Sequence, residues 1–288
     1  MILQKEIIQK AQTWKVPPDT VDKDYVLGHF LSVFFENYKD VLVFKGGTCL
    51  RKCYIEQYRF SEDLDFTALE KDFRLEPKTL QDIAEATERR TGIQFSVGEV
   101  VPLLSKDDPK GFQVSIKYWG ANHSKNLRPL PPSRWQTSIK LKVSTDEPIL
   151  LEPRTRDIFH PYSDTLQGNG QGICYSIDEV VAEKLRALKQ RSYTAPRDFY
   201  DLFYLTQSFS KEDWERVIPV FLKKMEHKKL PYQQPTDIID EAKVVHVKRA
   251  WNTSVAHQIT QGHQPSADEL ITAVVQRLKT HLPDIASK

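Results

Sequence analysis

A short apolar run that stops at two glycines constrains the fold of this chain more than any other feature. Residues 41–44 read Val-Leu-Val-Phe, and Lys45-Gly46-Gly47-Thr48 follows directly. The run is partly β-branched and ends at Gly46-Gly47, which predicts a buried strand that stops in a tight turn. The next segment, 48–60, is expected to form a helix that begins near Thr48. The chain must therefore pass from a strand through a glycine turn into a helix.

Two aspartates follow this turn at strand spacing. Asp63 and Asp65 alternate with Leu64 and Phe66, and on a strand this spacing places both carboxylates on one face. A Gly-Gly-Thr turn offers backbone N–H groups to an anion, and paired carboxylates can bind a divalent cation such as Mg²⁺. A Gly-Gly turn or an Asp-x-Asp pair alone is common. In this order they indicate metal-assisted transfer from a nucleotide.

The remaining pattern predicts an α+β protein, with a mixed β-sheet flanked by helices and a helical domain after it. Helical periodicity covers residues 1–38, 76–93 and most of the chain after Ser176. Alternating segments at 111–119 and 137–145 predict strands, and residues 147–151 are expected to continue the sheet. A Gly-rich stretch at 163–175 indicates a boundary. We therefore predict an N-terminal α+β domain at 1–172 and a helical domain at 173–288.

Charge and cysteine content exclude several classes of protein. The chain has 41 Lys and Arg against 39 Asp and Glu, a net charge of +2, which excludes a strongly basic nucleic-acid tail and an acidic disordered chain. Three cysteines are too few for a disulfide framework, so we expect free thiols and a reducing cytoplasm. The apolar runs are too short for a membrane span. The histidines show no metal-ligand spacing and are expected on the surface or in loops.

One stretch, residues 111–145, is basic and contains no Asp or Glu. Its cations alternate with aromatic residues, a composition that suits a nucleic-acid strand because cations meet phosphates and rings stack on bases. The alternative is a solvated loop whose tryptophans anchor a core. A second basic patch, at 223–229, is expected to be a solvated helix end. The candidate nucleic-acid contacts are Lys117, Arg128, Arg134, Lys140 and Lys142, with Tyr118, Trp119 and Trp135 among them.

These motifs carry a resemblance to a known family. Gly46-Gly47-Thr48-x-Leu50, followed by Ser61-x-Asp63-Leu64-Asp65, resembles the nucleotidyltransferase core of the DNA polymerase β-like superfamily. The downstream segments, Glu183-Lys184-Leu-Arg-Ala-Leu, Arg191 and Arg197-Asp198-Phe-Tyr-Asp201-Leu, narrow the resemblance to the AbiEii/AbiGii toxin family. It implies a toxin of a toxin–antitoxin or phage-defence pair, with an antitoxin as partner and no membrane. Such enzymes transfer a nucleoside monophosphate from an NTP to an acceptor, in some members the 3′ end of tRNA.

The resemblance also implies roles for individual residues. Asp63 and Asp65 would hold Mg²⁺, Lys184 would contact the nucleotide phosphates, and Asp198 or Asp201 would be a later essential acidic residue. From the residues alone, Lys184, Arg191 and Asp198 could equally form a structural ion-pair network between two helices. The nucleotide-binding set that the resemblance implies is Lys45, Gly46, Gly47, Thr48, Ser61 and Arg191.

One position departs from the superfamily pattern. A third carboxylate usually comes from a central strand, and the corresponding strand here carries Lys142, with Asp146 and Glu147 just beyond it. The site is therefore expected to hold one well-bound metal or to use Asp198 as a substitute. Two alternatives stay open: transfer to a protein or a small molecule such as an aminoglycoside, and a non-catalytic module that binds an NTP or an antitoxin.

Overall fold

The chain folds into two compact units of α+β and α character, and the predicted fold class is confirmed. The computed structural model describes residues 1–105, 108–123, 127–191, 195–260 and 265–285. The first unit comprises Met1–Glu147 and Pro153–Cys174, and the second comprises Pro148–Glu152 and Tyr175–Lys288. The resemblance makes residues 1–172 a nucleotidyltransferase core domain and residues 173–288 a helical domain, and this division of the chain stays a prediction.

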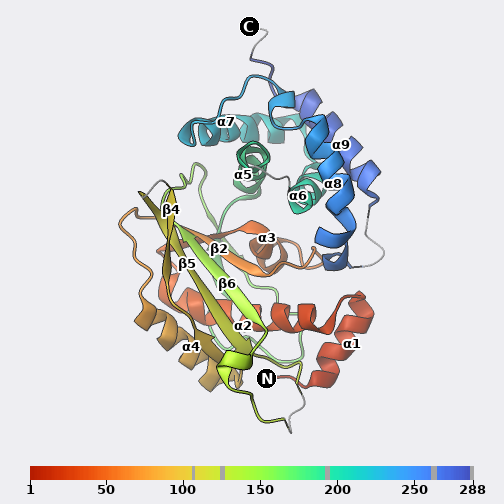
Figure 1. Ribbon diagram of the computed structural model, residues 1–288. Helices are drawn as coiled ribbons and strands as arrows, with labels where there is room; N and C mark the ends of the chain where they lie inside the picture. Colours follow the sequence, from red (N-terminus) through yellow and green to blue (C-terminus); the bar gives the residue numbers. More distant parts are fainter. Residues whose placement is uncertain (106–107, 124–126, 192–194, 261–264, 286–288) are drawn as a thin grey trace. The chain divides into compact units, whose positions relative to one another are not determined.

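The first unit is built on a mixed sheet in the order β3-β5-β6-β2-β1-β8-β7, with β4 beside β5 (Figure 1). The pairs β2–β6 and β1–β8 are parallel, and the other pairs are antiparallel. The strands are β1 (Leu42–Lys45), β2 (Asp63–Ala68), β3 (Gln94–Val97), β4 (Val101–Ser105), β5 (Asp108–Trp119), β6 (Ser138–Ser144), β7 (Arg154–Asp157) and β8 (Gln171–Cys174). The helices of this unit are α1 (Gln4–Trp14), α2 (Pro18–Tyr38), α3 (Gly46–Cys49) and α4 (Pro77–Thr91).

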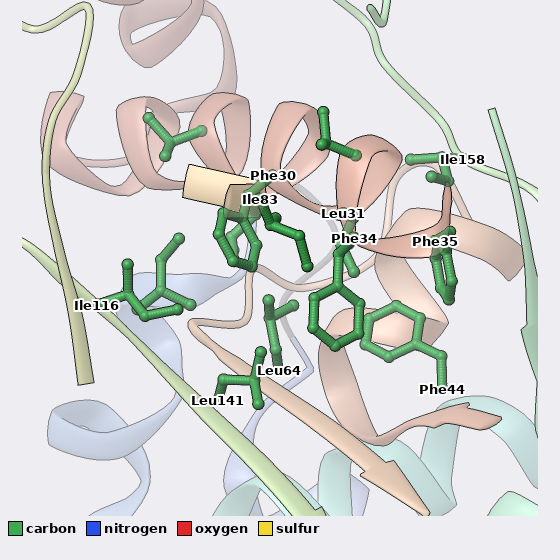
Figure 2. Packing of buried hydrophobic residues seen from close by; sticks show 14 of the residues in the cluster. Phe30, Leu31, Phe34, Phe35, Phe44, Leu64, Ile83, Ile116, Leu141 and Ile158 are labelled. Atoms are coloured by element: carbon green, nitrogen blue, oxygen red, sulfur yellow. The ribbon is translucent and has the colours of Figure 1, made fainter. Parts of the chain in front are cut away.

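The core of this unit lies between the sheet and the helices α2 and α4 (Figures 1 and 2). Phe34 and Phe35 of α2 pack against Phe66 of β2 with ring centroids 4.8 and 6.1 Å apart, and Phe44 of β1 lies 4.9 Å from Phe66. Leu64 belongs to the same cluster. Burying this apolar surface stabilises the unit by roughly 25 cal/mol per Å². It also fixes which face of β2 is left for polar side chains.

Two local predictions about this unit need correction. The helix expected near Thr48 begins earlier, at Gly46, and continues as a π-helix over Leu50–Tyr54, so residues 55–60 are not helical. Residues 147–151 do not continue the sheet. The backbone N–H groups of Leu150 and Leu151 donate to the Glu179 carboxylate instead, and sheet pairing would need those donors.

The second unit consists of packed helices around its own core. The helices are α5 (Ile177–Gln190), α6 (Pro196–Thr206), α7 (Lys211–His227), α8 (Glu241–Ser254) and α9 (Ala267–His281). Helix α5 packs on α6 and α7, and α6 packs on α8 and α9. Ser176 caps α5, because its side chain accepts from the Glu179 N–H. Trp214, Phe221 and Phe199 are buried here.

Candidate active site

Asp63 and Asp65 lie on the face of β2 opposite the hydrophobic core. Both are half-buried, whereas the alternating Leu64 and Phe66 are buried among the residues of α2. The register confirms the expected strand and places both aspartates on the same side. Two carboxylates are therefore held on a rigid strand and still reach solvent. Oxygen ligands of this kind suit a hard divalent cation.

The glycine turn lies directly against these carboxylates. Gly46 adopts a left-handed backbone with φ of 78°, and a Cβ at this position would lie 2.9 Å from Asp65 Oδ2. The Thr48 hydroxyl donates to the Asp63 carbonyl oxygen at 2.5 Å, which ties the turn to the first residue of β2. Thr48 is buried. Its side chain therefore positions the strand, and within the turn Gly47 is buried whereas Gly46 is partly exposed.

Ser61 and Arg59 complete this corner of the site. A Cβ on Gly47 would lie 2.8 Å from an Arg59 guanidinium nitrogen and 2.9 Å from Ser61 Oγ, so both side chains close over the glycine. Arg59 is buried and donates to the Phe60 carbonyl. The sequence motifs indicated Ser61 but not Arg59. The available signal was a cation two residues before Ser61, in a segment that was expected to be helical.

A row of lysines borders the aspartates on the neighbouring strands. Asp65 is paired with Lys142 of β6 on one side and with Lys45 of β1 on the other, and Asp63 is paired with Lys140. Paired residues in neighbouring strands project from the same face. Lys142 is therefore the side chain beside Asp65 on β6, the strand where the family resemblance led us to expect a third carboxylate. Among the described residues, no third His, Cys, Asp or Glu joins Asp63 and Asp65 in a group of potential metal ligands.

The basic stretch 111–145 divides between the sheet and a loop. Lys117 of β5 is paired with Ser138, which alternates onto the same face of β6 as Lys140 and Lys142, so these three cations share the carboxylate face. Arg128 and Arg134 are exposed in the loop that joins β5 to β6. The aromatic residues of the stretch, Tyr118, Trp119 and Trp135, are buried, and the Trp135 indole N–H donates to the Leu130 carbonyl at 2.6 Å. The tryptophans thus anchor a core, and these rings are not available for stacking on bases.

Buried charges fix the helical segment that follows the glycine turn. Asp24 of α2 accepts from Arg51 Nε at 2.6 Å, from Lys52 Nζ at 2.7 Å and from the Tyr162 hydroxyl at 2.9 Å. Burial alone would raise the pKa of Asp24, but the charges of Arg51 and Lys52 hold it below its usual range. A carboxylate bonded in this way stays ionised inside the core. The network locks the segment that carries the turn onto α2.

The later motif residues come together in the second unit. Lys184 Nζ on α5 lies 2.7 Å from a carboxylate oxygen of Asp198 and 2.7 Å from one of Asp201, both on α6. Arg191 pairs with the other oxygen of Asp198. Both aspartates are buried. This is the interhelical ion-pair network considered above, and the roles of these four residues in catalysis or nucleotide binding stay predictions.

Comparison with known proteins identifies the family. A family model described as the nucleotidyl transferase AbiEii toxin of a type IV toxin–antitoxin system matches residues 29–273. The chain belongs to this family. It is therefore a toxin-type nucleotidyltransferase, and the family implies an antitoxin as its partner. No curated protein matches the chain. Among the described residues, no helix is both long and apolar enough for a membrane crossing.

Solved structures agree at the level of the fold. The MenT4 nucleotidyltransferase toxin from Mycobacterium tuberculosis H37Rv is 17% identical, with a TM-score of 0.57 over 100% of this chain and 91% of that chain. A putative nucleotidyltransferase from H. pylori is 18% identical, with a TM-score of 0.51 over 89% of this chain and 95% of that one. At such identities the likeness shows the fold alone. The predicted α+β nucleotidyltransferase fold is thus confirmed.

Proposed function

We propose that this AbiEii-family toxin transfers a nucleoside monophosphate from an NTP to RNA, with the 3′ end of tRNA as acceptor. The observation that carries the proposal is the position of Asp63 and Asp65 on one face of β2, with the Gly46-Gly47 turn against them. In this reaction an acceptor hydroxyl gives up its proton to water and its oxygen bonds to the α-phosphorus, the bond from the α-phosphorus to the oxygen that bridges it to the β-phosphate breaks, and pyrophosphate leaves. The free thiols of all three cysteines fit a cytoplasmic site of action.

The donor set at β2 fits Mg²⁺. Carboxylate oxygens are its preferred protein ligands, and two half-buried aspartates on one strand face can supply them. A bound Mg²⁺ would neutralise phosphate charge and polarise the phosphoryl group. No third carboxylate in the described part of the chain joins the pair, which supports one ion rather than two. In this proposal the ammonium group of Lys142, which is paired in register with Asp65, supplies positive charge from the neighbouring strand β6.

Several residues of the turn would bind the triphosphate. Gly46 lacks a side chain and is partly exposed, so phosphate oxygens would approach the backbone N–H groups of the turn there, while Gly47 leaves room for the Arg59 and Ser61 side chains. Ser61 and Arg59 lie against Gly47 and would contact the same phosphates. Lys45 is paired with Asp65 and adds positive charge to this face. Thr48 contributes by fixing the turn to β2.

The second unit supplies a separate set of proposed roles. The family resemblance assigns Lys184 and Arg191 to the nucleotide and Asp198 or Asp201 to an essential acidic function. Helices α5 and α6 hold these groups in one network at contact distance. Because both aspartates are buried, removal of Lys184 changes stability as well as activity. Variants at these positions therefore need a folding measurement beside the activity assay.

An RNA acceptor is supported by the cations on the carboxylate face. Lys117, Lys140 and Lys142 project from the same side as Asp63 and Asp65. Phosphate contacts release counterions, so transfer to RNA should weaken steeply as salt concentration rises. Transfer to a small molecule should depend on salt far less.

A labelling experiment tests the proposal. The purified protein is incubated with each α-³²P-labelled NTP, Mg²⁺ and total tRNA, beside Asp63→Asn and the matched control Asp72→Asn, an exposed acid elsewhere. We expect label in tRNA with one NTP, its loss in Asp63→Asn, and its retention in Asp72→Asn. Equal labelling by wild type and Asp63→Asn would refute metal-assisted transfer at this site. Label on the protein instead would indicate Ser61 or a neighbouring hydroxyl as acceptor.

A non-catalytic module that binds an NTP or an antitoxin is the second candidate. The pairing of Lys142 with Asp65 favours it, because a lysine occupies the position of a metal ligand. This alternative predicts NTP binding with no transfer to any acceptor. Equilibrium binding of a labelled NTP, measured beside the transfer assay, separates the two.

A further inference from the structure

Two histidines that are far apart in the sequence meet one aspartate in the first unit. His29 lies on α2, and His160 and Asp164 lie in the segment between β7 and β8. His29 Nε2 is 3.3 Å from Asp164 Oδ2, and His160 Nε2 is 2.9 Å from Asp164 Oδ1. One potential ligand atom from each residue lies within 4.8 Å of the others. No spacing in the sequence predicts this group, because the fold alone brings α2 and this segment together.

The polar atoms of this group are incompletely satisfied. His29 is 1% exposed, so the expectation of a surface or loop position is wrong for it. Its Nε2 lies near Asp164 without forming a hydrogen bond, and among the described residues its Nδ1 has no hydrogen-bond partner either. His160 Nδ1 is also buried without a partner in the described part of the chain. Buried polar groups of native proteins are nearly always bonded, and an unsatisfied one needs an explanation. A bound cation that accepts the lone pairs of the imidazole nitrogens would explain the missing hydrogen bonds.

We propose that His29, His160 and Asp164 form a site for a divalent transition-metal ion, Zn²⁺ foremost. Imidazole nitrogens favour Zn²⁺ and its neighbours in the first transition row, whereas Mg²⁺ favours oxygen ligands. Tetrahedral Zn²⁺ with bonds of about 2.0–2.2 Å needs ligand atoms roughly 3.4 Å apart. The His29–Asp164 distance of 3.3 Å already meets this. Water would complete the coordination beside Asp164, whose side chain is 29% exposed.

The surroundings support a site of this kind. The Tyr25 hydroxyl donates to Asp164 Oδ2 at 2.7 Å, the type of outer contact that orients a ligating carboxylate. Gly28 leaves room for the ring, since a Cβ there would lie 3.1 Å from His160 Nδ1. The nearby cation Lys52 is balanced by Asp24 at 2.7 Å.

A bound metal ion would cross-link two segments of the first unit. It would join α2 to the segment that leads into β8, and both belong to the first unit. The ligands come from α2 and this segment rather than from β2, so the site is distinct from the Asp63 and Asp65 pair. The proposal therefore does not depend on the proposed enzymatic reaction.

Metal titration tests the inference. Full-length protein is stripped with a chelator, checked for its helical circular dichroism, and titrated with Zn²⁺ against a chromophoric chelator. We expect one equivalent to bind, with loss of that equivalent in His29→Gln and in Asp164→Asn. Asp164 is partly exposed, so Asp164→Asn is the variant that keeps the fold. Binding should persist in the exposed-histidine control His246→Gln and in Asp63→Asn.

Two further readouts make the result decisive. Co²⁺ should give the visible spectrum of a tetrahedral nitrogen and oxygen site in wild type but not in Asp164→Asn. Tyr25→Phe should raise the Kd for Zn²⁺ about 10- to 100-fold, because it removes the contact that orients the carboxylate. The inference is overturned if the stripped protein binds no Zn²⁺, which would leave the group as two histidines packed beside a carboxylate. Unchanged Zn²⁺ binding in both His29→Gln and Asp164→Asn would overturn it equally.

Discussion

Lys224 and Glu179 form an ion pair that is fully buried in the second unit. Both side chains are 0% exposed. Lys224 Nζ lies 2.5 Å from Glu179 Oε1 and donates to the Pro148 carbonyl at 2.9 Å. The Glu179 carboxylate also accepts from the Leu151 N–H at 2.9 Å. The pair therefore fastens the segment Pro148–Glu152 onto helices α5 and α7.

Replacing Lys224 by Met should destabilise the second unit strongly. The substitution keeps most of the stem but leaves the Glu179 carboxylate buried without a countercharge. Breaking a buried pair in this way costs about 3–5 kcal/mol, which lowers the melting temperature by roughly 10 °C or more for a domain of this size. Urea unfolding followed by circular dichroism measures the free energy. The matched control is Lys223→Met, because Lys223 is exposed on the same helix.

The double variant Lys224→Met/Glu179→Gln tests the electrostatic part of this reasoning. A glutamine in place of Glu179 would keep an oxygen for the Leu150 and Leu151 N–H groups without carrying a charge. We therefore expect the double variant to recover at least about half of the lost free energy, because the uncompensated charge is gone. A cost below about 1 kcal/mol for Lys224→Met, or a double variant no more stable than the single one, would refute the argument.

Three further predictions address other parts of the structure. Burial raises the pKa of Asp22 from 3.8 to about 7, despite hydrogen bonds from the N–H groups of Ala121 and Asn122. The Asp22 carboxyl ionises at a lower pH in the unfolded chain than in the folded one, so the free energy of unfolding should fall by up to about 4 kcal/mol as pH rises between these two pKa values. Urea titrations at several pH values should show this fall in wild type and a flatter dependence on pH in Asp22→Asn. A Cβ on Gly47 would press on a guanidinium nitrogen at 2.8 Å, so Gly47→Ala should lower kcat of transfer at least about tenfold with the fold intact; unchanged kinetics would contradict this. Lys184→Met removes the cation shared by the buried Asp198 and Asp201 carboxylates, of which Asp198 still pairs with Arg191. It should cost about 3–5 kcal/mol in thermal unfolding, and Lys184→Arg should cost less.

Local chemistry made the centre of the site predictable. The strand at β1, the turn at Gly46-Gly47 and the alternation of Asp63 with Leu64 each depend on neighbours within a few residues. The helix that ends at Gly92 is of the same kind, because a left-handed φ of 75° there favours glycine. Patterns with a period of two or of about four residues carry this information directly.

Long-range pairing made the rest unpredictable. The Leu150 N–H donates to the Glu179 carboxylate rather than to a neighbouring strand, and no feature of residues 147–151 predicts this contact. Lys224 is part of a Lys-Lys pair that indicates a solvated helix end, yet it is buried. The strands β3, β4, β7 and β8 are short and depend on partners elsewhere in the sheet. The sequence predicts a helix through residue 60, but the observed helix ends at Tyr54, so the place of Arg59 against Gly47 could not be predicted.

The register of the sheet bears on how many metal ions the site can hold. Asp63 and Asp65 face three lysines on the paired strands, Lys45, Lys140 and Lys142, so this set of side chains carries more positive than negative charge before any ligand binds. A second divalent ion would add two further charges beside Lys142, and charges a few ångströms apart near a protein surface repel by several kcal/mol. A triphosphate, by contrast, brings negative charge to the same face and is attracted by all three lysines. The electrostatics of the pairing thus favour one Mg²⁺ with a bound nucleotide. Replacing Lys142 by Glu should shift the dependence of transfer on Mg²⁺ concentration, and an unchanged Mg²⁺ titration would exclude a role for this lysine in the charge balance.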